Sequence, residues 1–159
     1  MGKYRAIDVA RWFIFKNQEI MQDMGGDELT LLKLLKLLYY AEGCSLALGN
    51  GSLFEEKFLA WEHGPVVAEV YAAYSKDPYH LPFGTEADVA SVEKINRNAA
   101  DRAVLEDVFD VFGKYSAWGL RNMTHEETPW LEATEQGQRL NGEISRETMK
   151  RFFQEHYVS

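Results

Sequence analysis

The sequence contains one cysteine, Cys44, and no run of about 18 apolar residues among its 159 positions. A single cysteine cannot form an intrachain disulfide, and nothing else in the composition requires an oxidising compartment. The most apolar stretch near the start, residues 6–15, is interrupted by Asp8 and Arg11, so it does not resemble a secretory signal. We therefore expect a cytoplasmic protein without a membrane span.

Basic residues are also scarce, since 17 Lys and Arg stand against 25 Asp and Glu, for a formal net charge of -8. Such a chain lacks the positive surface of a non-specific nucleic-acid or anionic-membrane binder. Neither a membrane nor a nucleic acid is therefore the expected partner. Apolar residues make up 46% of the chain, which is enough for one domain to bury a core without disulfides or metals.

No catalytic or metal-binding pattern is complete in this sequence. The four histidines show no pair at the spacing of a helical metal site, and a lone cysteine cannot build a zinc site. The segment His125-Glu126-Glu127 resembles part of a zinc-protease helix, but it lacks the second histidine. No glycine-rich phosphate loop follows an expected strand. We therefore predict no metal, no cofactor and no enzymatic activity.

Apolar residues recur at three- and four-residue steps along most of the chain, which predicts a mainly α fold of about six to seven helices. The segment 31–48 is apolar nearly all round, as is typical of a central helix. No repeat, low-complexity tract or charge block divides the chain. Residues 1–159 are therefore expected to form one domain, with a core at about 8–153. The other expected helices span residues 8–24 (N-capped by Asp8), 65–74 and 99–112, and residues 86–95 are an optional short helix within a loop. Shorter helices are expected after Ser116, at Thr128-Pro129 and from Ser145.

The segment 54–62 is too irregular for a helix, and residues 58–61 are expected to be extended, with a short β-hairpin as an option. Gly64-Pro65 is expected to open the third helix, since proline suits the first helical position. The free backbone amides at the start of this helix would donate hydrogen bonds to an acidic or carbonyl group. The simpler alternative is that this loop only sets the angle of the helix and buries Trp61.

Two sequence blocks are more specific than composition. The first is LLKLLYYAEG at residues 34–43, followed by AWEHGPVV at 60–67 and VY at 70–71. The second is YSAWGL at 115–120, followed by Thr124-His125 and Pro129-Trp130. In this order and spacing, the blocks resemble the Panacea domain, the SocA-like antitoxin family of phage-associated proteins.

The resemblance implies a mostly helical antitoxin of a prophage or another mobile element, without enzymatic activity, that neutralises a cognate toxin by direct protein–protein binding. The toxin is expected to be encoded by the adjacent gene. The family covers many unrelated toxins, so the resemblance does not name this one. The candidate partner-binding residues are Trp61, Glu62, His63, Gly64, Pro65 and Tyr71.

Several alternatives stay open at this point. The protein could deliver a bound client to a protease, or act as a small enzyme through His63 or His125. Autoregulatory DNA binding would need a basic face within the acidic total. Lys33 and Lys36 could touch a phosphate, but we expect their stems to cover apolar surface while the ammonium groups stay in water. Cys44 is expected to be a small buried residue rather than a nucleophile.

Overall fold

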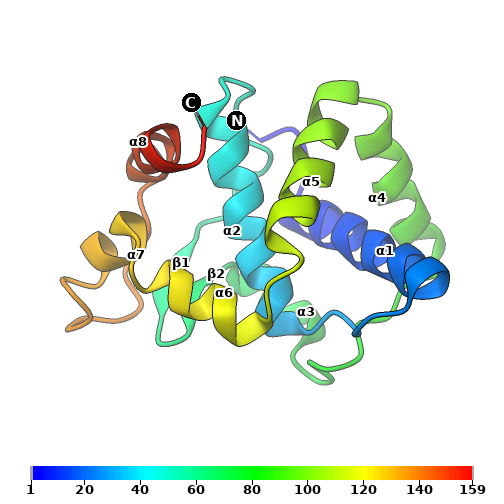
Figure 1. The fold of residues 1–159 in the computed structure, drawn as a ribbon, viewed down its shortest axis with the longest axis horizontal. Coiled ribbons are helices and arrows are strands. Elements are labelled where there is room, and N and C mark those ends of the chain that lie inside the picture. The colour runs from blue at the N-terminus through cyan, green and yellow to red at the C-terminus, as the bar shows by residue number, and fades with distance from the viewer. Residues whose placement is uncertain (1, 159) are drawn as a thin grey trace.

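Helix α2 (Leu31–Ala47) runs through the middle of the computed structural model, which describes residues 2–158 (Figure 1). Thr30 caps it, since its hydroxyl accepts from the Lys33 amide at 3.3 Å. Helices from both ends of the chain pack against α2, and most of its residues are buried. The expected central helix is therefore confirmed, and its nearly continuous apolar surface is explained by neighbours on several sides.

The described part of the chain forms eight helices and one two-stranded sheet, so the fold is mainly α as predicted. The helix number exceeds the expected six to seven, because residues 86–96 form a complete helix and not an irregular loop. Thr85 caps this helix by accepting from the Asp88 amide at 3.1 Å. The remaining elements are α1 (Ala6–Met24), β1 (Leu59–Trp61), β2 (Gly64–Val66), α3 (Ala68–Tyr74), α4 (Glu86–Asn96), α5 (Ala99–Phe112), α6 (Ala117–Thr124), α7 (Thr128–Ala133) and α8 (Arg146–His156).

The start of α3 differs from the prediction. Pro65 lies in β2, opposite Ala60 of the antiparallel strand β1, and α3 begins only at Ala68. Proline is tolerated in this strand because Ala60 forms its backbone hydrogen bonds on the other side. The Ala60 amide donates to the Gly142 carbonyl at 2.8 Å, and its carbonyl accepts from the Asn141 amide at 2.7 Å.

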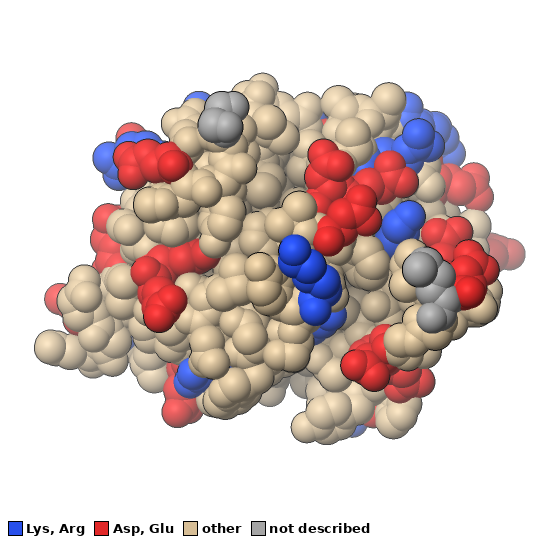
Figure 2. Space-filling view, viewed as in Figure 1, with Lys and Arg blue, Asp and Glu red and all other residues tan. Residues whose placement is uncertain are grey.

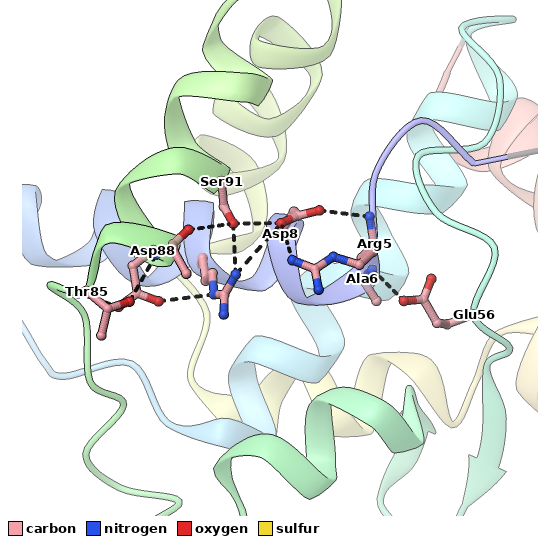
Figure 3. Close-up of polar contacts among 9 residues, drawn as sticks. Arg5, Ala6, Asp8, Glu56, Thr85, Asp88 and Ser91 are labelled. Atoms are coloured by element: carbon pink, nitrogen blue, oxygen red, sulfur yellow. Dashed lines mark hydrogen bonds and ion pairs between the residues drawn. The ribbon is translucent and has the colours of Figure 1, made fainter.

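The first helix begins two residues earlier than predicted, and Asp8 lies inside its first turn. The Asp8 carboxylate still caps the helix, since it accepts from the Arg5 amide at 2.9 Å. It also accepts from the Ser91 hydroxyl of α4 at 2.6 Å, and Glu56 accepts from the Ala6 amide at 2.8 Å (Figure 3). These contacts connect the start of α1 to α4 and to the segment before β1.

Helix α8 is held against α2 by a buried ion pair. The fully buried Glu42 carboxylate accepts from Arg146 Nε at 2.6 Å and from the Leu53 amide at 2.7 Å. Ser145 caps α8, as predicted, by accepting from the Thr148 amide at 3.2 Å. Across residues 2–158, none of the helices combines the length and the apolar character needed to cross a membrane.

Candidate functional site

The hairpin β1–β2 rests on α6 and α7, so the two sequence blocks come together in space. Trp130 Nε1 donates to the Trp61 carbonyl at 3.0 Å, and His125 Nε2 lies 2.6 Å from the Glu62 carbonyl. The His125 and Trp130 rings lie 4.0 Å apart, centroid to centroid. His125 Nδ1 lies 2.6 Å from the Arg121 carbonyl, so both ring nitrogens face backbone oxygens. A neutral imidazole donates to only one of them, and a protonated ring donates to both.

Strand β2 of the hairpin is closely packed over a buried lysine. Lys36 is fully buried, and its Nζ donates to the Pro65 carbonyl at 2.9 Å. Gly64 has a φ of 109°, and a Cβ there would lie 2.7 Å from Lys36 Cε and 2.8 Å from Thr124 Oγ1. Only glycine fits this backbone conformation without strain. The expectation that Lys36 keeps its ammonium group in water is therefore wrong, because the hairpin covers it.

Burial sets the protonation of Lys36. Removal from water, together with the nearby positive charge of Arg121, lowers its pKa from the ordinary 10.5 to about 7. Lys33, three residues earlier, is only partly buried and donates from Nζ to the Gly113 carbonyl. Neither ammonium group is therefore free to receive a phosphate in this conformation.

Aromatic and cationic side chains lie on the outer face of the hairpin. His63 is exposed, and its ring lies 5.5 Å from that of Trp118, which is 54% exposed. Arg121 stacks 4.5 Å above the Trp118 ring and donates from Nε to His63 Nδ1 at 3.3 Å. The Trp61 and Tyr71 rings, which line one cavity together with His63, meet edge to face at 5.1 Å. We call these five side chains the aromatic face.

A cavity of about 330 Å³ opens between the aromatic face and the start of α2. Its apolar wall is built by the leucines of α2 together with Val66 and Pro78. Its rim carries the polar atoms of Glu62 and His63. The residues that line it are Leu31, Leu32, Leu35, Lys36, Trp61, Glu62, His63, Val66, Tyr71 and Pro78. Such a pocket can take an apolar side chain from a partner and offer hydrogen bonds at its edge.

The predicted site residues separate into two groups. Trp61, Glu62, His63 and Tyr71 line the cavity together, whereas Gly64 and Pro65 are buried in strand β2. The predicted free amides at a helix N-terminus do not occur here, because Gly64–Val66 is a strand. Trp61 is half-buried, and its Nε1 donates to Asn141 Oδ1 at 2.9 Å.

Two residues of the aromatic face were missed in the sequence. Trp118 belongs to the second block but is not among the predicted partner-binding residues. Arg121 lies outside both blocks, so no sequence motif points to it. Their placement depends on contacts with His63 across 58 residues of chain. Of the other aromatics of the blocks, Tyr39, Tyr40 and Trp130 are buried core residues, whereas Tyr115 is exposed.

A buried carboxyl lies behind this site. Glu127, just before α7, accepts from the Tyr39 hydroxyl at 2.9 Å, from the Tyr40 hydroxyl at 3.1 Å and from the Tyr157 hydroxyl. Burial raises the pKa of Glu127 from 4.5 to about 7, although the three phenols favour the ionised form. The cluster joins α2 to α7 and to the end of α8. Among residues 2–158, no group of three His, Cys, Asp or Glu side chains is arranged to hold a metal ion.

Comparison with known proteins supports the resemblance seen in the sequence. The family model described as antitoxin SocA-like, Panacea domain, matches residues 34–131. The matched range includes most of α2, the hairpin and α6, and it contains every residue of the aromatic face. No curated protein and no solved structure matches the chain significantly.

Proposed function

The chain belongs to the antitoxin SocA-like Panacea family, and we propose that it neutralises a cognate toxin by binding it directly through the aromatic face. The adjacent gene is the expected source of the toxin. In this proposal, an apolar side chain of the toxin enters the cavity that Trp61 and Tyr71 line together with the start of α2. Trp118, Arg121 and His63 then contact the toxin beside that cavity.

The observation that carries the proposal is the exposure of Trp118 and Tyr71 beside a formed cavity. Trp, Tyr and Arg are the residue types that dominate binding energy at protein interfaces. Both rings are held in place before binding, because Trp118 stacks with Arg121 and Tyr71 packs against Trp61. Preformed side chains lose little conformational entropy on binding, which favours affinity.

The overall charge adds to the rate of encounter. A chain with a net charge of -8 attracts a basic protein over long range. The local positive charge of Arg121 sets the orientation of the docked toxin, since it needs an acceptor or an acidic group opposite it. Association should therefore slow as salt is added, because screening weakens the long-range attraction.

The histidines do not support the enzyme alternative. Within residues 2–158, His63 contacts Arg121 and the Trp118 ring, and His125 contacts two backbone carbonyls. Neither imidazole has a carboxylate partner to orient it as a general base. The role of His125 is to hold the hairpin on α6.

Co-expression tests the proposal. The product of the adjacent gene is produced in cells with the wild-type chain, with Trp118→Ala or with His63→Ala, and growth is measured. We expect the wild type to restore growth and both variants to lose most of that protection. Purified proteins should form a complex on gel filtration with the wild type alone.

His156→Ala is the matched control, because His156 is also exposed and stacks on an aromatic ring, Phe152, at 4.3 Å on α8. It should protect as well as the wild type. Thermal melts must show that all variants stay folded. Full protection by Trp118→Ala would exclude the aromatic face, and a toxin that shows a shorter half-life instead of a stable complex would indicate delivery to a protease.

A further inference from the structure

An apolar groove lies at the opposite end of α2 from the aromatic face. Cys44 and Leu48 form one wall, and Val104, Val108 and Val111 of α5 form the other, around a cavity of about 330 Å³. Leu48 is 56% exposed and Val111 is 49% exposed, so both apolar side chains reach the rim. The start and the end of α2 lie about 20 Å apart along the helix axis, which makes the two cavities separate sites.

The floor of the groove is rigid. Phe112 stacks on the buried Tyr40 ring at 4.0 Å, and Tyr157 meets Phe112 edge to face at 5.4 Å. The Tyr157 hydroxyl donates to Glu127, which fixes Tyr157 at the groove. A preformed apolar groove between helices suits the apolar side of a third helix.

Acidic side chains border the groove. Asp107 lines it, and Asp110 follows one turn later on α5. Both are exposed, and neither forms an ion pair with another described residue. Figure 2 shows acidic side chains gathered over α5, beside a largely uncharged surface over the end of α2. No lysine or arginine is among the lining residues.

The partly buried thiol of Cys44 feels the same negative charge. Removal from water, together with the charges of Asp107 and Glu127, raises the pKa of Cys44 to about 12. A positive group placed over this rim would therefore meet a favourable field, whereas an acidic group would be repelled.

We infer that this groove binds an amphipathic helix of a partner protein, with its apolar side against Leu48 and Val111 and its lysines or arginines over Asp107 and Asp110. The inference goes beyond the proposed function, because it concerns a second surface and does not depend on toxin binding at the aromatic face. A second copy of this chain fits less well, because the acidic rims would face one another in a symmetric dimer.

A synthetic helix tests the inference. The probe is a fluorescein-labelled Leu/Lys peptide of about 18 residues, with leucines on one side and lysines on the other. Fluorescence anisotropy measures its binding to the whole chain at low and high salt. We expect saturable binding that weakens at least about tenfold in Val111→Lys and loses part of its salt dependence when Asp107 and Asp110 are both changed to Asn.

Val89→Lys is the matched control, because Val89 is a similarly exposed valine, 42% exposed, on α4 outside the groove. It adds the same charge, so it should bind the peptide like the wild type. Equal weakening by Val89→Lys, or equal binding of a peptide with Glu in place of Lys, would overturn the inference. Gel filtration that shows a dimer broken by Val111→Lys would also overturn it, since the occupant would then be a second copy.

Discussion

Replacing Glu127 by glutamine should change how the stability of the fold depends on pH. The Glu127 carboxyl is buried against three tyrosine hydroxyls, those of Tyr39, Tyr40 and Tyr157. Burial penalises the charged carboxylate more than the phenols stabilise it, so the pKa rises from 4.5 to about 7. Glutamine has nearly the same shape and does not titrate. Its carbonyl oxygen accepts from the tyrosines, whereas its NH2 group donates where the second carboxylate oxygen accepted.

The sign and size of the effect follow from the raised pKa. Below about pH 4.5 the carboxyl is protonated in both the folded and the unfolded chain, and its contribution to stability is fully present. As the pH rises through 7, the unfolded chain has already released the proton and the folded chain must follow, so this contribution is lost. The difference between 4.5 and about 7 corresponds to about 3 kcal/mol in the free energy of unfolding.

Urea unfolding followed by circular dichroism measures this effect at several pH values between about 4.5 and 8. The wild type should lose about 3 kcal/mol relative to Glu127→Gln across this range. The other ionisable groups are common to both proteins, so their effects cancel in the difference. A difference that stays constant with pH would refute the reasoning, because it would show that the three phenols keep Glu127 ionised in the fold.

Further substitutions test the packing around the site and between α2 and α8. The wild type should become more stable between about pH 7 and 10, because the folded chain releases the Lys36 proton near pH 7 while the unfolded chain retains it up to 10.5. Lys36→Met should abolish this rise in the free energy of unfolding, which urea unfolding at the two pH values measures. Gly64→Ala should cost at least about 2 kcal/mol, since its Cβ would meet Lys36 at a φ of 109°. Gly49→Ala, at a φ of 77° with no atom within 4 Å, should cost only about 1 kcal/mol in the same assay. Arg146→Met should lower the melting temperature strongly, by a loss of about 3–5 kcal/mol, and adding Glu42→Gln should recover much of it, because Glu42 is then no longer a buried unpaired charge.

Helical periodicity predicted most of the fold, because the apolar contacts that specify a helix recur within a few residues of sequence. The central position of α2 follows from apolar residues on nearly every side of it. The start of α3 was wrong for a reason outside that local pattern. Pro65 fits in a strand only because the backbone of Ala60, opposite it, forms its hydrogen bonds with Asn141 and Gly142. These two residues lie some 80 residues later in the chain.

The candidate site was predictable only in part. The block around Trp61 and His63 indicated where the hairpin lies. Tyr71 contacts Trp61, and the two residues are close in the sequence. The burial of Lys36 depends on the Pro65 carbonyl, 29 residues away, and the Arg121–His63 contact spans 58 residues. No local pattern reports such contacts, because they form only when the hairpin packs on α6.

The residues that make the family recognisable are mainly those that hold the hairpin in place. They are a different set from the exposed residues that bind the toxin in our proposal. Gly64 and Pro65 form the start of β2, and Lys36 donates to the Pro65 carbonyl. His125 and Trp130 contact the carbonyls of Glu62 and Trp61. These groups face inward, so substituting them should change stability first and binding second. The side chains that meet a toxin in our proposal, Trp118 above all, lie outside that framework and can change without disturbing it. The choice of toxin should therefore follow the exposed side chains on α3 and α6, and exchanging those between two members of the family should transfer neutralisation while the hairpin contacts are kept.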